Sequence, residues 1–175
     1  MLIKCNAHDH LYLIDDDPVR GTLFKDSRIR FDDPFAVYAE INEETGEIAA
    51  VVCVVVCKFI PQDEDQLRLI AGGRVQEIEE QMYEALEGSG GDGDNLGTVV
   101  CPYTIWSYQR GHGRNLINNL LEAVPILHPE ADALITMSPH TKTALKFHVG
   151  NGAVIVGHGE GSVNYEYDIP EVTLH

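Results

Sequence analysis

The alternation of apolar and polar positions predicts a mixed sheet in this chain. Residues 35–41 alternate as a strand, and residues 48–60, which begin with the uncharged apolar run 48–57, predict a long buried strand that Pro61 ends. The polar stretch 42–46 between them is typical of a hairpin loop. Residues 98–106 and 133–137 predict two further strands, and residues 153–156 and 162–167 predict a closing antiparallel hairpin.

Three stretches carry a helical period instead. Residues 62–87 place apolar side chains on one face, with a break at Gly72 and Gly73, and the acidic loop of residues 88–97 follows. We interpret residues 62–97 as a largely helical insertion that covers the sheet. A second helix places Leu116, Ile117 and Leu120 on one stripe, before a connection bracketed by Pro125 and Pro129.

The third predicted helix spans residues 141–149 and is closed by Gly150, Asn151 and Gly152. It turns Ala144, Leu145, Phe147 and His148 toward the protein. Nearer the N-terminus, residues 11–14 predict an edge strand, and Pro18 suits the first position of a helix.

The order of strand, glycine turn, helix and strand over residues 98–137 predicts a crossover between two parallel strands. Together these patterns favour an α/β (α+β) fold with a mixed central sheet and flanking helices, in a single domain over residues 1–175. Ligands of such sheets lie outside the carboxyl ends of the parallel strands, and Ser138 follows the second strand at one of those ends.

The charge balance excludes some partners. Twelve Lys and Arg against 28 Asp and Glu give a formal net charge of −16, which disfavours nucleic acid and anionic membranes. It suits a cationic acceptor or a salty medium, and the sequence does not choose between them.

The longest apolar run is too short to cross a bilayer, and no signal-peptide pattern opens the chain, so we expect a cytoplasmic protein. Cys53 and Cys57 are expected to be small buried hydrophobes, because they lack the spacing of metal ligands.

The glycine turn between the first parallel strand and its helix is the main candidate for chemistry. Gly111 and Gly113 carry no Cβ, so the backbone can approach an anion at the positive end of the helix dipole. Arg110 and Arg114 flank the turn as possible phosphate partners. The same glycines would also suit a tight turn with no ligand. The motifs of nucleotide triphosphatases and of dinucleotide-binding domains are absent.

A family resemblance sharpens this interpretation. The segment Arg110-Gly111-His112-Gly113-Arg114-Asn115-Leu116-Ile117 resembles the R-G-x-G-R-x-L-hydrophobic motif of the GNAT acyltransferase superfamily, and residues 141–148 stand where that superfamily has N-x-x-A-x-x-F-Y. The resemblance implies that residues 110–115 bind the pyrophosphate of an acyl-CoA. It also implies that the strand before the turn, including Ile105, Trp106 and Ser107, offers backbone groups to the pantetheine arm. We therefore expect the two parallel strands to splay apart at their carboxyl ends, since an unbroken ladder would occupy those groups. His148 replaces the tyrosine that commonly protonates the departing thiolate.

A second likeness is to the catalytic half of malonyl-CoA decarboxylases. Thr136-Met137-Ser138-Pro139 is similar to their T-L-S-P, and residues 147–153 and 163–167 are similar to their F-H-x-x-N-G-A and A-N-Y-x-Y. This resemblance implies that Ser138 and His148 form a catalytic pair. The helical N-terminal domain of that family and its long segment between serine and histidine are missing from this sequence.

The sequence therefore favours an acyltransferase and leaves two alternatives open. The acyltransferase would pass an acetyl or other short acyl group from CoA to an amine, with His148 protonating the sulfur at a pKa near 6.5. The first alternative is a decarboxylase of malonyl-CoA, and the second is a non-catalytic acyl-CoA-binding module. We expect acetyl-CoA or another short acyl-CoA as the small-molecule substrate, a cationic amine as the acceptor of the acyltransferase, and no metal. The oligomeric state stays open, a homodimer included.

Overall fold

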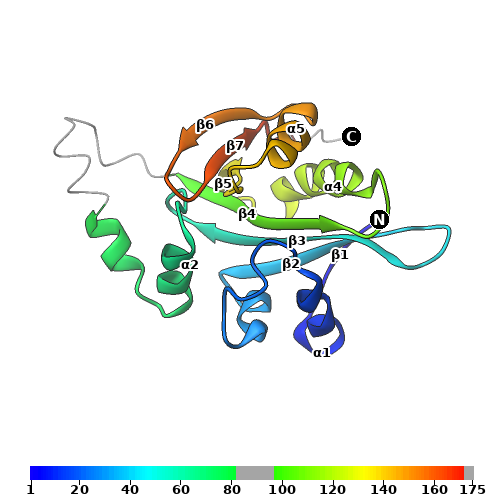
Figure 1. The fold of residues 1–175 in the computed structure, drawn as a ribbon, viewed down its shortest axis with the longest axis horizontal. Helices are drawn as coiled ribbons and strands as arrows, with labels where there is room; N and C mark the ends of the chain where they lie inside the picture. Colours follow the sequence, from blue (N-terminus) through cyan, green and yellow to red (C-terminus); the bar gives the residue numbers. More distant parts are fainter. Residues whose placement is uncertain (82–96, 172–175) are drawn as a thin grey trace.

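A seven-stranded mixed sheet forms the centre of the protein (Figure 1). The computed structural model describes residues 1–81 and 97–171. In spatial order the sheet contains β1 (Leu2–Lys4), β2 (Phe35–Ile41), β3 (Ile48–Cys57), β4 (Thr98–Ser107), β5 (Ala131–Ile135), β7 (Val163–Tyr167) and β6 (Val154–His158). Neighbouring strands are antiparallel except β4 and β5, which are parallel. The predicted mixed sheet and the crossover between parallel strands are confirmed.

Helical segments cover both faces of this sheet (Figure 1). The helices α4 (His112–Leu127) and α5 (Lys142–Gly150) lie on one side. The other side carries the short α1 (Ala7–His10), the 3₁₀ segments η1 (Leu11–Asp16) and η2 (Ser27–Phe31), and α2 (Glu64–Ala71). None of the helices within residues 1–81 and 97–171 is long and apolar enough to span a membrane.

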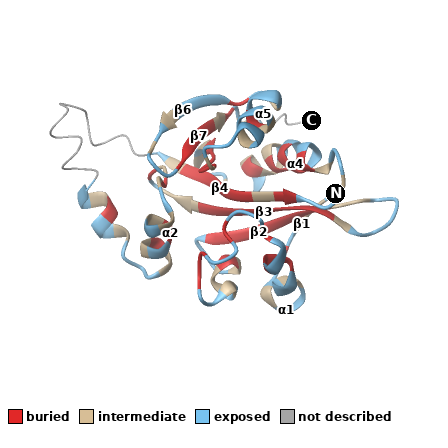
Figure 2. Cartoon of the chain, viewed as in Figure 1, coloured by how far each residue is buried: buried red, intermediate tan, exposed pale blue. Residues whose placement is uncertain are grey.

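Strand β3 is buried on both faces, which explains its unbroken apolar sequence (Figure 2). Its residues alternate between two hydrophobic clusters. Val51, Cys53 and Val55 pack with the N-terminal segment and α2, whereas Val52 and Val54 pack beneath α4. Burial raises the pKa of the Cys53 thiol to about 12, so this cysteine is the inert hydrophobe that its position in the strand predicts.

Several predicted boundaries are wrong for local reasons. Residues 11–14 form the 3₁₀ segment η1 rather than an edge strand, because Leu13 and Ile14 pack onto the face of the sheet while β1 occupies the edge beside β2. Pro18 begins no helix and lies in a turn. Pro125 lies inside α4, in its last turn, rather than in the connection after it, and its missing N–H group removes one hydrogen bond from that turn. Leu145 is 43% exposed and does not face the protein.

The predicted insertion is only partly described. Helix α2 ends where Gly72 and Gly73 interrupt the helical period, and Gly73 adopts a left-handed φ of 72°. Residues 75–81 are again helical. The remainder of the insertion, including most of the acidic loop, lies outside the described residues.

The parallel strands β4 and β5 separate after a short paired section. Their register covers Thr98 to Val100 of β4, and one further hydrogen bond joins the Met137 N–H to the Pro102 carbonyl at 2.9 Å. Tyr103 is an extra residue in β4, since Pro102 and Thr104 face consecutive residues of β3. Beyond it, β4 continues along β3, while Ser138 exchanges both backbone hydrogen bonds with Val163 of β7. The splayed strand pair is therefore confirmed.

Candidate functional site

A cavity of about 300 Å³ opens where β4 and β5 separate. It is lined by residues 102–107 of β4, by the segment 136–139 that follows β5, and by side chains from α4 and α5, including Phe147 and His148. Most of these groups are apolar. We name this space the cleft.

Ser138 and His148 meet in the cleft. The Ser138 Oγ lies 3.0 Å from His148 Nε2 and donates a hydrogen bond to Thr136 Oγ1 at 2.9 Å. On the other side of the imidazole ring, Nδ1 lies 2.8 Å from the Tyr167 hydroxyl. The ring also stacks on Tyr165 with a centroid separation of 4.7 Å. Both ring nitrogens of His148 are thus engaged, and serine, histidine and tyrosine form one hydrogen-bonded chain.

Burial controls the protonation state of this chain. His148 is only 3% exposed, and desolvation lowers the pKa of its imidazole to about 4. No carboxylate forms a hydrogen bond or ion pair with this ring among the described residues. The ring is therefore neutral at pH 7, and the expected pKa near 6.5 is wrong.

Next to the cleft, the glycine turn opens into a second and wider hollow of about 730 Å³. Residues 107–111, Gly113 and Arg114 line one side, and Thr143, Lys146 and Asn151 line the other. Arg110, Arg114 and Lys146 bring positive charge to this hollow in a chain that is otherwise acidic. The first N–H groups of α4 have no acceptor within the helix. The hollow therefore combines the groups that an anion such as a pyrophosphate requires.

The two glycines also have local roles. Gly111 caps α4 with a left-handed φ of 85°, which strongly favours glycine. A Cβ on Gly113 would lie 3.3 Å from the Phe147 ring, so this glycine allows α5 to pack against the start of α4. Both structural roles hold whether or not an anion binds.

The structure separates the predicted site residues into three groups. Ile105, Trp106, Ser107, Ser138 and His148 line the cleft. Arg110, Gly111 and Arg114 line the hollow at the turn, and Ser107 and Gly113 line both spaces. His112 and Asn115 line another cavity, beside Glu40. Their side chains therefore lie away from the proposed anion site.

Two residues at the site, Lys146 and Arg20, were not predicted from the sequence. Lys146 lies on the helix that borders the cleft, and its only signal is a cation four residues before the terminal Gly150 of that helix. Arg20 lies in a turn-rich stretch with no motif, yet its side chain reaches both β4 and the segment after β5. Among the described residues, no group of three or more His, Cys, Asp and Glu side chains is placed to hold a metal ion.

The fold is similar to those of several solved structures. The chain is similar to malonyl-CoA decarboxylase from Agrobacterium vitis, with a TM-score of 0.57 and 18% identity over 84% of this chain and 35% of the decarboxylase. It is similar to Arabidopsis thaliana NAA60 in complex with acetyl-CoA, with a TM-score of 0.52 and 12% identity over 95% of each chain. It is also similar to an aminoglycoside acetyltransferase from an uncultured soil metagenomic sample, with a TM-score of 0.53 and 12% identity over 98% of each chain.

These likenesses establish the fold of the GNAT acyltransferases, which malonyl-CoA decarboxylases share. The chain spans about a third of the length of the decarboxylase. No protein-family model and no curated protein sequence matches it.

Proposed function

We propose that this protein is an enzyme that acts on a short acyl-CoA. The thioester would lie in the cleft and the CoA pyrophosphate at the glycine turn. The observation that carries the proposal is the 3.0 Å contact between Ser138 and His148 inside the cleft. A hydroxyl and an imidazole in hydrogen-bond contact, with the imidazole held by a third group, can both orient a substrate and move a proton.

The reaction that this site supports best is decarboxylation of malonyl-CoA or a related thioester. Loss of CO₂ needs no charged base, and an apolar cleft disfavours the substrate carboxylate relative to the dispersed charge of the transition state. The Ser138 hydroxyl would orient the carboxylate. The enolate that remains is a much stronger base than a thiolate, so its carbon could take a proton from the neutral chain of serine, histidine and tyrosine, and the chain would then regain that proton from solvent.

The second candidate is transfer of an acyl group to a cationic amine. The exposed carboxylates Asp15 and Asp16 favour it, since they lie within four residues of Pro18 and Val19, which line the cleft. They would attract an ammonium group to the cleft entrance. The neutral His148 weighs against this reaction, because protonation of a leaving thiolate benefits from a stronger acid.

Turnover of malonyl-CoA without an acceptor tests the proposal. Purified protein should convert malonyl-CoA to acetyl-CoA, measured by chromatography and mass spectrometry, and Ser138→Ala should abolish the conversion. Ser162→Ala is the matched control, since Ser162 is equally buried but its Oγ donates to the Gln62 carbonyl. Release of CoA from acetyl-CoA only when an amine is present would favour transfer instead. CoA binding with no turnover of any acyl-CoA would contradict both reactions.

A further inference from the structure

The separation of β4 and β5 leaves backbone carbonyls that need hydrogen-bond donors. The last hydrogen bond between the two strands uses the Pro102 carbonyl and the Met137 N–H. The next carbonyls, those of Tyr103 and Met137, lie where the strands diverge. Tyr103 is the extra residue of the β4 bulge, and Met137 directly precedes Ser138. Buried carbonyls without a partner would destabilise the open arrangement.

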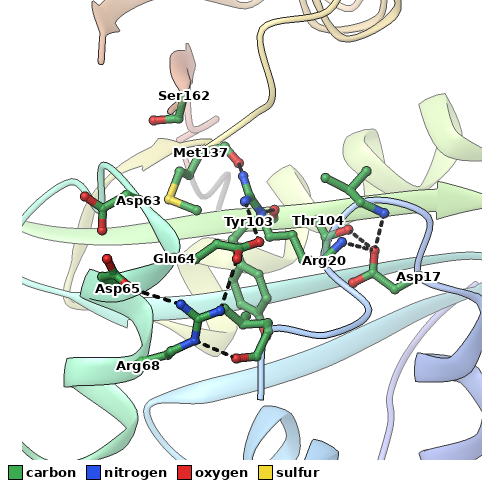
Figure 3. A network of polar contacts seen from close by, with 12 residues as sticks. Asp17, Arg20, Asp63, Glu64, Asp65, Arg68, Tyr103, Thr104, Met137 and Ser162 are labelled. Atoms are coloured by element: carbon green, nitrogen blue, oxygen red, sulfur yellow. Dashed lines mark hydrogen bonds and ion pairs between the residues drawn. The ribbon is translucent and has the colours of Figure 1, made fainter. Parts of the chain in front are cut away.

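The guanidinium of Arg20 joins these two carbonyls (Figure 3). Its Nε donates to the Tyr103 carbonyl at 2.6 Å, and its Nη2 donates to the Met137 carbonyl at 3.2 Å. The side chain is 7% exposed. A single rigid group therefore spans the two strands at the point where they separate, and the spacing of its nitrogens fixes how far apart the carbonyls lie.

Both the guanidinium and the backbone of Arg20 are held in place by further contacts. Its Nη1 donates to Glu64 Oε1 at 3.2 Å, and its backbone N–H donates to Asp17 Oδ1 at 2.9 Å. The Arg20 carbonyl accepts from Arg30. These contacts anchor the guanidinium to the N-terminal segment and to the start of α2 (Figure 3). The cation thus has a defined position as well as a partner for its charge.

We propose that Arg20 is a positioning residue that sets the width of the cleft and the placement of Ser138. Arg20 does not line the cleft. It acts through the backbone of Tyr103, which borders the cleft on β4, and of Met137, whose carbonyl precedes Ser138. Lysine would keep the charge, but its ammonium is a compact point donor without the planar fork that spans both carbonyls. The role of Arg20 in placing Ser138 for catalysis rests on the proposed function. Its role in fixing the separation of the two strands does not.

Amide hydrogen exchange in Arg20→Lys tests the effect on the strands. The Met137 and Ser138 N–H groups, which donate to Pro102 and Val163, should exchange about tenfold faster or more than in the wild type, because charge-assisted contacts at the adjacent carbonyl are lost. Arg28→Lys is the matched control, since Arg28 pairs with Asp26 at the surface. Glu64→Gln removes the charge partner and retains both carbonyl contacts, so its exchange at these two amides should stay near that of the wild type.

Unchanged exchange at Met137 and Ser138 in Arg20→Lys would overturn the inference. A uniform increase at all amides would also overturn it, since that result describes loss of global stability alone.

Kinetics provide the second readout. Arg20→Lys should lower kcat by about 10²-fold with a much smaller change in KM, because a displacement of the reacting groups by about 1 Å has this effect. A rise in KM at unchanged kcat would contradict the positioning of Ser138. If the wild type turns over no acyl-CoA, the proposed function fails, and the exchange measurements still decide the role of Arg20.

Discussion

His148 shows how burial changes what one residue can do. A histidine at this place in the sequence suggests a proton donor of ordinary pKa, but the side chain stacks on Tyr165 and contacts Ser138 and Tyr167. Desolvation then lowers the pKa of the imidazole to about 4. A neutral ring can still relay a proton between the two hydroxyls, since one nitrogen accepts while the other donates.

Replacement of His148 by Gln tests this role. Glutamine keeps a polar group of similar reach but cannot relay a proton, so kcat should fall by about 10²–10⁴-fold with CoA binding largely retained. Steady-state kinetics on malonyl-CoA, with CoA affinity from calorimetry, give both values. His140→Gln is the control, because His140 is exposed and contacts the Gly159 carbonyl outside this chain. A near-native kcat would leave His148 with a structural role only.

The same residue makes stability depend on pH. The imidazole pKa is about 4 in the folded protein and about 6.5 in the unfolded chain, so the unfolded chain takes up the proton first as pH falls. His148 should therefore destabilise the fold progressively between pH 6.5 and 4, by at most about 3 kcal/mol at the acidic end. Urea unfolding across this range should show that the free energy of unfolding falls less steeply with decreasing pH in His148→Gln than in the wild type. The same pH dependence in both proteins would contradict the lowered pKa of His148.

At the scale of elements, the turn between β4 and α4 defines the anion site in the proposed function. The side chains of Arg114 and Lys146 come from two different helices and line the same hollow. Both Gly111 and Gly113 also have structural roles, through a positive φ and through packing on Phe147. Substitutions of these glycines would disturb the fold, so the exposed cations give the cleaner test.

Arg114→Gln should weaken CoA binding by about 10–100-fold, since a charge-assisted hydrogen bond contributes about 1.5–3 kcal/mol. Binding of acetyl-pantetheine, which has no pyrophosphate, should not change. Calorimetric titration of the two ligands into the variant and into an Arg28→Gln control separates a phosphate contact from general disruption. Equal losses for both ligands would exclude Arg114 from the phosphate site.

Much of the fold follows from local pattern, and the exceptions have physical causes. Strand β2 has its predicted bounds because its alternating residues face two separate cores. The segment η1 could not be predicted, since a short apolar run fits a strand and a 3₁₀ segment equally well. The contact between Ser138 and His148 followed from a family resemblance alone. The bridge made by Arg20 depends on side-chain contacts between residues more than 80 positions apart, which no local pattern records.

At the scale of the whole molecule, buried charge joins the N-terminal segment to the sheet. Asp17 accepts hydrogen bonds from the backbone of Val19 and Arg20, from Thr104 of β4 at 2.8 Å, and from Arg30 at 2.7 Å. The Asp17 and Arg30 side chains are 0% and 1% exposed. The segment that carries Arg20 to the cleft is thus fixed by an ion pair in the interior.

The last prediction concerns Asp17→Asn. Asparagine preserves the shape but leaves Arg30 buried without its counter-ion, so the free energy of unfolding at pH 7 should fall by about 3–5 kcal/mol. Burial alone would raise the pKa of Asp17, but the hydrogen bonds from Arg20, Val19, Arg30 and Thr104 hold it below the ordinary value of 3.8. The stabilisation is therefore present above pH 3.8 and is lost as pH falls through the folded pKa.

Urea unfolding of the variant at pH 7 and at descending pH below 5 checks both statements. Asp26→Asn is the control, because its partner Arg28 is exposed and the same charge is removed from the surface. The wild type should have a larger free energy of unfolding than Asp17→Asn until the pH falls below 3.8. The loss of stability that His148 causes occurs separately, at higher pH. An Asp17→Asn protein as stable as the control at pH 7 would show that the interior ion pair does not hold the N-terminal segment on the sheet.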